Sequence, residues 1–481
     1  MLRKYIQKFQ QMPVTVRSSL WYTICNFLQR GMAVITVPIF TRLLTTEQYG
    51  LCSIYFAWFE IFVLFTSLKM PYEGLNNGLI RHEEDKDGYA SAVLGLITVL
   101  TIGMFILYLI FGRWIDVFTG LNRVVMVLMF VQVFFNPALA LWTNREKFDF
   151  RYRLPVVVTI LSALLAPVIS VLAVLFTDYK AEGRIAGTVA VQAIFGLICY
   201  FLIFGKGKKF YVKEYWHFAL GFNLPLVFYY MSQTILNDAD RIMIQHYIGT
   251  GEAGIYNVGY SAASLVRLLV SAINGSLNPW MYRKLKSGEY REISGVVNAI
   301  GLFFGAAILG LCMFAPDLIR ILAARDYYAA IWIVPPVAVS IFYLFLYQVF
   351  ANVEMYYGKN QGAALISILA AVANVILNAI AIPIWGYQAA GWTTLICYML
   401  LAVLHYILMQ KAFREAGGEG ELFRLPVLIG ISAVITAITA LGLAMYQLSW
   451  GRYLILLAEL VLGILFRERI LAFIKKITAR G

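Results

Sequence analysis

The chain has 481 residues, of which 61% are hydrophobic and only 14% are charged, and its mean hydropathy is +0.75. Apolar stretches long enough to cross a bilayer recur along its whole length, which excludes an ordinary water-soluble domain and indicates a polytopic membrane protein. The net charge of +13 does not indicate nucleic-acid binding, because most of the 39 Lys and Arg residues fall in loops predicted to be cytoplasmic, where they set topology and contact membrane lipid.

About fourteen segments are predicted to be transmembrane helices. In chain order they are residues 18–41, 51–74, 90–111, 124–143, 154–177, 184–204, 217–246, 253–280, 293–315, 331–356, 362–383, 389–410, 425–446 and 450–466. The alternation of basic and less basic loops places both termini in the cytoplasm of a cell (plasma or inner) membrane protein. The first segment has no small-residue cleavage pattern after it, so it is predicted to be a retained span and not a signal peptide.

The first two spans carry charged side chains. Arg30 lies near the middle of the first span and shares a helix face with Asn26 and Gln29. Intramembrane charge is usually functional, so we expect these three residues to bind an anionic substrate group; alternatively, Arg30 pairs with Glu60 or caps a backbone break. Glu60 is also a candidate for ion coupling. Lys69 faces nearly opposite to Glu60 and either contacts substrate or extends its long side chain to the interface.

The seventh span has a polar face near its end. Asp238, Asp240 and Arg241 lie there within one turn of each other. Arg241 is a candidate ligand for phosphate or sugar hydroxyls, and Asp240 or Asp238 is a candidate acceptor of a coupling proton or Na⁺. The alternative is a local ion pair between Asp238 and Arg241 without a transport role.

A polar stripe follows one face of the eighth span. Its members are Asn257, Ser261, Ser264, Arg267, Ser271, Asn274 and Asn278. Such a stripe would be costly against lipid, so we expect it to face protein or a water-filled cavity. Arg267 can contact phosphate oxygens bidentately and is predicted to bind substrate. Asn257, Ser264 and Asn274 are predicted to bind the same substrate.

Other intramembrane polar residues have weaker functional signals. Glu354 could couple ions, but its place near the inner end of its span favours a position at the interface. Asn374 and Asn378 are one turn apart and are predicted to join helices by hydrogen bonds. The five cysteines and four histidines show no metal-ligand or disulfide spacing, and no phosphate loop or catalytic constellation is present, so the sequence predicts neither a cofactor nor an enzyme.

Two short patterns recur along the chain at one common interval. The matching segments are Glu47–Ile54 with Gly251–Val258, and Gly183–Gly187 with Tyr387–Gly391. Each pair occupies equivalent places relative to the predicted spans. Two six-helix halves that insert in the same sense are therefore expected, with a substrate site between them.

The predicted fold is all-α and polytopic, with two pseudo-symmetric six-helix bundles and two extra C-terminal helices. The bundles are expected at residues 1–205 and 206–412. Residues 413–481 would hold the two additional helices and a basic cytoplasmic tail.

Several segments resemble the polysaccharide-transport oligosaccharide flippases. They are Ser18–Trp21, Pro38–Gly50, Asp240–Arg241, Ile248–Gly249, Gly254–Tyr256, Tyr357–Lys359 and Ile382–Gly391. The resemblance extends over nearly the whole chain. It implies membership of the superfamily that also contains multidrug exporters and flippases for lipid-linked peptidoglycan precursors.

The resemblance implies a flippase that moves a polyprenyl-diphosphate-linked oligosaccharide, such as a capsule or O-antigen repeat unit, to the outer leaflet by alternating access. Membrane lipid, polysaccharide polymerase and glycosyltransferases would be its partners. The main alternative is a multidrug or cation exporter of the same superfamily, which would depend more on acidic than on basic cavity residues. A membrane glycosyltransferase and a purely structural partner in polysaccharide assembly are further alternatives.

Overall fold

The computed structural model describes residues 12–465 and 467, and of residues 26, 30, 33, 360 and 449 it describes the backbone alone. The described chain is helical throughout, without a β-strand, which confirms the predicted all-α polytopic class. It divides into two compact units, unit 1 at Met1–Thr234 and unit 2 at Ile235–Gly481. The predicted domain limits at residues 205 and 412 stay predictions.

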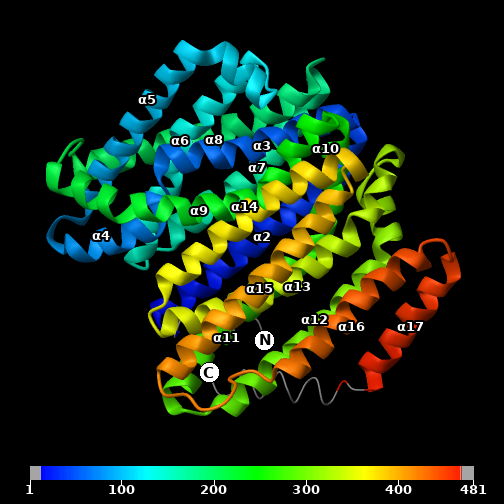
Figure 1. The fold of residues 1–481 in the computed structure, drawn as a ribbon. Helices are drawn as coiled ribbons and strands as arrows, with labels where there is room; N and C mark the ends of the chain where they lie inside the picture. Colours follow the sequence, from blue (N-terminus) through cyan, green and yellow to red (C-terminus); the bar gives the residue numbers. More distant parts are fainter. Residues whose placement is uncertain (1–11, 466, 468–481) are drawn as a thin grey trace, which may run out of the picture. The chain divides into compact units, whose positions relative to one another are not determined.

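Unit 1 contains the helices coloured blue to green in Figure 1. They are α2 (Val14–Leu43), α3 (Thr46–Ser67), α4 (Leu75–Arg81), α5 (Lys86–Thr119), α6 (Arg123–Phe148), α7 (Arg153–Phe176), α8 (Lys180–Gly207) and the first part of α9 (Lys213–Tyr247). A short π-helical turn at Met70–Gly74 and a 3₁₀ turn at Glu83–Asp85 flank α4.

Unit 2 continues from the second part of α9. Its helices are α10 (Thr250–Ala263), α11 (Leu265–Ser287), α12 (Tyr290–Leu322), α13 (Val334–Tyr356), α14 (Asn360–Trp385), α15 (Ala389–Glu415), α16 (Leu425–Met445) and α17 (Ser449–Leu465). A 3₁₀ segment at Arg325–Trp332 joins α12 to α13.

Every predicted span overlaps a helix of the structure. Within the described residues, eleven helices are long and apolar enough to cross a membrane: α2, α3, α5 to α8 and α12 to α16. The other predicted spans correspond to α9, to α10 with α11, and to α17. Helix α9 and the pair α10 with α11 carry the polar stripes found in the sequence, and these polar residues lower the hydropathy of the helices.

The eighth predicted span is two helices. It was expected as one continuous helix over 253–280, but α10 ends at Ala263 and α11 begins at Leu265. At the junction Ser264 has ψ −9°, and the Arg267 backbone N–H donates to the Ser264 carbonyl three residues earlier instead of four. The helix is therefore tightened for one turn in the middle of its polar stripe.

Local capping chemistry sets several helix ends in unit 1. Thr45 and Gln48 form a reciprocal capping box that starts α3, and Asn122 accepts from the Val125 backbone N–H at the start of α6. Helix α5 ends at Gly120, whose φ of 67° lies in the left-handed region where glycine has no steric penalty. These helix ends depend on residues within a few positions of each end, so the sequence alone carries the signal for them.

Glycines permit close helix packing in the middle of unit 1. A Cβ placed on Gly196 of α8 would lie 2.4 Å from the Phe135 carbonyl oxygen of α6. A Cβ on Gly187 would lie 2.5 Å from Ser170 Cα of α7. Helix α8 therefore packs backbone to backbone against both neighbours, as small residues allow in membrane bundles.

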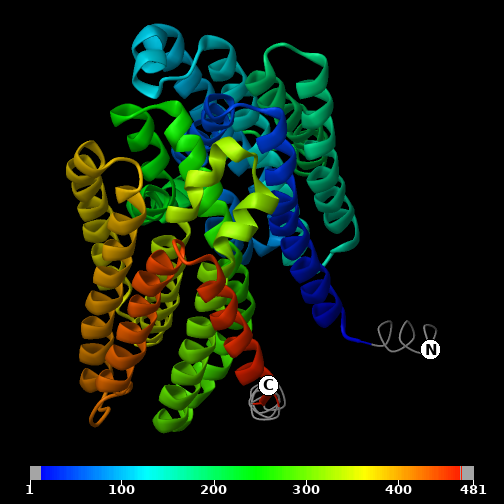
Figure 2. The same cartoon turned by 90° about the vertical axis from the view of Figure 1, so that its right-hand side faces the viewer.

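The two C-terminal helices pack against α12 in unit 2. Helix α16 runs beside α12 in Figure 1, and α17, in red, faces the viewer in Figure 2. Arg452 of α17 is 4% exposed and donates to the Met313 carbonyl at 3.0 Å and to Asp317 Oδ2 at 3.2 Å. Ile435 of α16 packs beside Gly305 of α12. Helices α16 and α17 are thus integral parts of unit 2.

Candidate functional site

Asp240 is the centre of a buried polar cluster in unit 2. Its carboxylate, on α9, is 1% exposed. Tyr256 Oη of α10 donates to Asp240 Oδ2 at 2.5 Å, and Thr394 Oγ1 of α15 donates to the same oxygen at 2.8 Å. Asn378 Nδ2 of α14 donates to Oδ1 at 2.7 Å. Three helices thus supply neutral donors to one buried carboxylate, a group that can accept a proton.

A second layer of polar groups supports the Asp240 cluster. Asn378 Oδ1 accepts from Thr393 Oγ1 of α15, and Asn378 Nδ2 lies 3.3 Å from Asn374 Oδ1. Both asparagines are fully buried. The prediction of interhelical hydrogen bonds is confirmed for Asn378, which connects α14 to α9 and α15, whereas the hydrogen bond of Asn374 is to Asn378 on the same helix.

Arg241 lies beside Asp240 on α9 and is tied to its surroundings. Its Nε donates to Asn257 Oδ1 of α10 at 2.8 Å, and its Nη1 donates to Asp238 Oδ1 at 3.0 Å. The guanidinium carbon also lies 4.5 Å from the centre of the Tyr260 ring. The alternative expected from the sequence, a local Asp238–Arg241 ion pair, is therefore present, and Asn257 contacts the same arginine.

Arg267 of α11 approaches the same aromatic ring. Its guanidinium carbon lies 5.7 Å from the Tyr260 ring centre, and Nη2 donates to Asn237 Oδ1 at 2.8 Å and to Tyr398 Oη at 3.5 Å. Its Nε is buried and has no hydrogen-bond partner within the described residues. Arg241 and Arg267, which we call the Tyr260 arginines, concentrate two positive charges around one ring.

Two of the remaining members of the polar stripe bond to α13. Asn274 Nδ2 donates to Gln348 Oε1 of α13 at 2.7 Å, and Asn278 Oδ1 accepts from Asn352 Nδ2 at 3.1 Å. Ser264 lies at the junction of α10 and α11. The stripe therefore faces protein over much of its length, which is one of the two environments expected for it.

Glu354 and His405 form a buried pair in unit 2, linking α13 to α15. His405 Nδ1 lies 3.0 Å from both carboxylate oxygens of Glu354, and the two side chains are 0% and 1% exposed. Glu354 lies near the end of α13, as expected, but its carboxylate contacts His405 inside the packed helices and not water. The Tyr347 ring stacks on His405 with the centroids 5.5 Å apart.

Unit 1 has its own polar pocket, which we call the amide pocket. It has a volume of 430 Å³ and is lined by Gln29, Asn136 and Gln192 among others. Gln192 Oε1 accepts from Asn136 Nδ2 at 3.0 Å and from Gln132 Nε2 at 2.8 Å. Of the predicted residues of the first span, Gln29 lines this pocket, whereas the side chains of Asn26 and Arg30 lie outside those described.

Arg184 of α8 also lines the amide pocket. Its guanidinium carbon lies 4.3 Å from the Phe40 ring centre and 4.6 Å from that of Tyr49. The sequence prediction missed this cation because it treated Arg184 as the start of a span. Its sequence signal was an arginine within the repeated Gly183–Gly187 pattern.

Lys69 and Glu60 form an ion pair, with Lys69 Nζ 3.3 Å from Glu60 Oε2. The expectation that these two residues face nearly opposite directions is wrong. It assumed one continuous helix, but α3 ends at Ser67, and Leu68 and Lys69 have φ of 48° and 52° in the left-handed region. The reversal of the backbone turns Lys69 back toward Glu60.

A family model described as polysaccharide biosynthesis protein matches residues 15–284. Protein 1 of the Lsg locus of Haemophilus influenzae is 24% identical over 372 residues, which cover 74% of this chain and 88% of that protein.

Two solved structures have a similar fold. One is the lipid II flippase MurJ in an inward closed conformation, with a TM-score of 0.67 and 12% identity, covering 94% of this chain and 99% of MurJ. The other is an inward-facing multidrug resistance MATE family transporter of the MOP superfamily, with a TM-score of 0.59 and 14% identity, covering 83% of this chain and 96% of the transporter. At these identities the likeness concerns the fold.

Proposed function

This chain belongs to the polysaccharide biosynthesis protein family, and from that membership and its fold we propose that it transports a lipid-linked oligosaccharide across the cell membrane. The cargo is a polyprenyl-diphosphate-linked repeat unit of a surface polysaccharide, moved from the cytoplasmic to the outer leaflet by alternating access. Glycosyltransferases would supply this substrate and a polymerase would consume it. Flipping changes no covalent bond, so the chain acts as a transporter and not as an enzyme.

The observation that carries this proposal is the pair of Tyr260 arginines. A diphosphate needs cations in a place shielded from bulk water, where each charge contact is stronger. Arg267 has a buried Nε without a partner among the described residues, so it has a donor to offer an entering oxygen. Arg241 keeps its position through Asn257 and Asp238.

The remaining predicted site residues take supporting roles in this proposal. Asn257 orients Arg241, and Asn274 orients Gln348. Ser264 lies at the junction of α10 and α11, three residues before Arg267. Gln29, with the amide pocket, offers hydrogen-bonding groups to sugar hydroxyls. Asn26, Arg30 and the Lys69–Glu60 pair remain predicted contributors in unit 1.

Ion coupling is assigned to Asp240. Its carboxylate is buried, its neighbours are neutral donors, and Arg241 follows it in the chain. A proton or Na⁺ bound there would compensate the buried negative charge. Asp238 is the weaker candidate, because Arg241 already compensates its charge.

The test is the distribution of lipid-linked oligosaccharide between the leaflets of membranes that carry variants of this chain. We expect R267Q to slow outward transport by roughly tenfold to hundredfold, as one charge-assisted contact to phosphate is lost. R267K should retain part of the activity because it keeps the charge. R283Q, which removes an exposed arginine of the same helix α11, is the matched control and should behave as the parent chain.

Wild-type transport by R267Q would reject the phosphate-binding role. The second candidate function is export of amphipathic cations, and the burial of Asp240 in a fold shared with a MATE transporter favours it. In that case D240N would abolish drug efflux, and removal of the chain would leave the leaflet distribution of the oligosaccharide unchanged.

A further inference from the structure

A second pocket of unit 1 lies where α2 and α7 begin and α6 and α8 end. Its volume is 660 Å³, within the range of small-ligand sites. By the predicted topology, these four helix ends all lie on the cytoplasmic side. We call it the basic pocket, because Arg17, Arg151, Arg153 and Lys206 line it.

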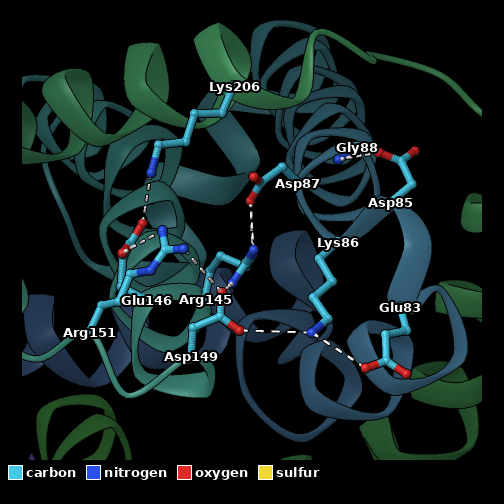
Figure 3. Close-up of polar contacts among 10 residues, drawn as sticks. All are labelled: Glu83, Asp85, Lys86, Asp87, Gly88, Arg145, Glu146, Asp149, Arg151 and Lys206. Atoms are coloured by element: carbon cyan, nitrogen blue, oxygen red, sulfur yellow. Dashed lines mark hydrogen bonds and ion pairs between the residues drawn. The ribbon is translucent and has the colours of Figure 1, made fainter.

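The charge of the basic pocket is incompletely compensated. Glu146 is the carboxylate in its lining, and two of the cations share it: Lys206 Nζ is 2.9 Å and Arg151 Nη1 is 3.9 Å from its oxygens. Figure 3 shows both contacts. Four cations against one carboxylate leave a positive excess, which favours an anionic ligand.

The nearest other carboxylates are engaged by cations outside the pocket. Arg145 binds Asp149 Oδ2 at 2.7 Å and Asp87 Oδ1 at 2.9 Å, and Lys86 lies 3.9 Å from Asp149 (Figure 3). Arg151 reaches Asp149 only at 3.9 Å. This ionic cluster holds α5 and α6 together, and Asp149 compensates part of the charge of Arg151. The lining of the basic pocket still has more cations than carboxylates.

Arg17 supplies an independent observation. Its Nε is buried and has no hydrogen-bond partner in the part of the chain that the structure describes. A buried guanidinium N–H without an acceptor is costly, because it has lost water and gained nothing in return. An anionic oxygen in the pocket would satisfy it.

The turn after α6 is also unusual. The backbone N–H groups of Phe150 and Arg151 donate to the carbonyls of Lys147 and Glu146, which is the Schellman pattern of a helix end. The residue in the left-handed position is Phe150, with φ of 55°, where glycine would be free of strain. A strained aromatic residue that lines a pocket is a feature typical of functional turns.

Polarity changes with depth along the basic pocket. Arg17 and Lys206 lie in the terminal turns of α2 and α8, while Leu202 and Trp142 lie about one turn farther into their helices. Leu154 and Pro155 add apolar surface at the start of α7. The pocket is thus cationic at the helix ends and apolar toward the predicted bilayer.

We infer that the basic pocket binds the phosphate-bearing headgroup of a membrane lipid, with the first part of the hydrocarbon chain against its apolar wall. Arg17, Arg151 and Arg153 contact the phosphate oxygens, and Trp142 and Leu202 contact the chain. A free phosphate would leave the apolar wall unused, so the chemistry of the pocket favours the lipid. The basic pocket belongs to unit 1 and shares no residue with the Tyr260 arginines of unit 2, and its assignment does not depend on the proposed cargo.

The test measures lipid retention by the purified full chain with native mass spectrometry. Three probes are used: phosphatidylglycerol, decaprenyl phosphate and inorganic pyrophosphate. We expect R17Q/R153Q to weaken retention of both lipids by about tenfold or more, since two charge-assisted contacts are lost. R283Q/K286Q makes the same charge change at exposed positions of α11 and should retain both lipids as the parent chain does.

A folding defect is separated by two further variants. R17K/R153K keeps the charges and should retain most of the lipid. F150G removes the backbone strain at the turn, so it should keep or raise the melting temperature. It also removes a ring that lines the basic pocket, so lipid retention should fall.

An equal loss of lipid retention in R17Q/R153Q and in R283Q/K286Q would overturn the inference, because lipid binding would then follow the overall charge of the protein. Pyrophosphate binding as tight as that of either lipid would also overturn it, by showing a site for the free anion. Preference for decaprenyl phosphate or for phosphatidylglycerol supports the inference in either case and identifies the lipid class. Because the readout is binding, it is unaffected by failure of the transport proposal.

Discussion

At the scale of single residues, unit 2 concentrates ionisable side chains where membrane helices are normally apolar. Asp240 has neutral donors, the Tyr260 arginines have amide and aromatic partners, and Glu354 has His405. Each of these buried charges is therefore stabilised by a different kind of partner. These differences predict different responses to substitution.

His405→Ala should destabilise the protein strongly. It would leave the Glu354 carboxylate buried without its partner, which costs about 3–5 kcal/mol in comparable buried pairs. Thermal unfolding in detergent measures this loss. E354L/H405L replaces both groups with apolar side chains and should recover most of it, and H246A, at an exposed histidine, should have little effect.

Asp149 predicts a dependence of stability on pH. Burial raises the pKa of its carboxyl, but the hydrogen bond and charge of Arg145 outweigh burial and lower the pKa from its ordinary value. Because the folded pKa lies below the unfolded one, the stabilisation is complete above about pH 4 and is lost as the pH falls through the folded pKa. Unfolding midpoints between pH 6 and pH 3 should therefore fall less steeply in R145Q than in the parent. R291Q is the control, and parallel curves for parent and R145Q would contradict the assignment.

At the scale of helices, the close approach of α8 to its neighbours depends on glycine. Helix α8 packs against α6 at Gly196, where a Cβ would meet the Phe135 carbonyl oxygen. That oxygen belongs to the backbone, so the clash cannot be relieved by a rotamer change. The two helices would have to separate.

Gly196→Ala should consequently lower stability by about 1–3 kcal/mol. Gly205→Ala is the matched control, because it lies on the same helix and a Cβ there would meet nothing within 4 Å. That change should be neutral or stabilising by up to about 1 kcal/mol, since alanine favours helix more than glycine does. Equal melting temperatures for the two variants would show that the α6–α8 contact is more tolerant than its geometry indicates.

At the scale of the whole molecule, we propose that transport is driven by a proton or Na⁺ gradient or by the membrane potential. The Asp240 cluster is the proposed coupling site in unit 2. Its three donors come from α10, α14 and α15, so ion binding there would act on several helices together.

Asp240→Asn should therefore uncouple transport from the gradient. In proteoliposomes with an imposed proton or Na⁺ gradient, the parent chain should accumulate cargo in one leaflet, whereas D240N should only equilibrate it. D326N, at an exposed residue of the 3₁₀ segment before α13, is the control. Gradient-driven accumulation by D240N would move the coupling site elsewhere, with the Glu354–His405 pair as the next candidate.

The sequence by itself determined the medium, the positions of the helices and the family. Hydrophobic length and loop charge depend on nearby residues only, so all fourteen predicted spans overlap helices, and the resemblance carried by segments such as Pro38–Gly50 agrees with the matching family model. It also identified Asp240, Arg241 and Arg267 as unusual, because a charge in an apolar segment is visible without a fold.

Only the tertiary structure decided which groups meet. Glu354 and His405 are distant in sequence and meet because α13 packs on α15, and Asn378 reaches Asp240 from another helix. Helical periodicity failed at Lys69, since two left-handed residues after α3 cannot be read from composition. Partners, burial and pocket shape depend on packing between distant segments, and a single sequence records each segment without its neighbours.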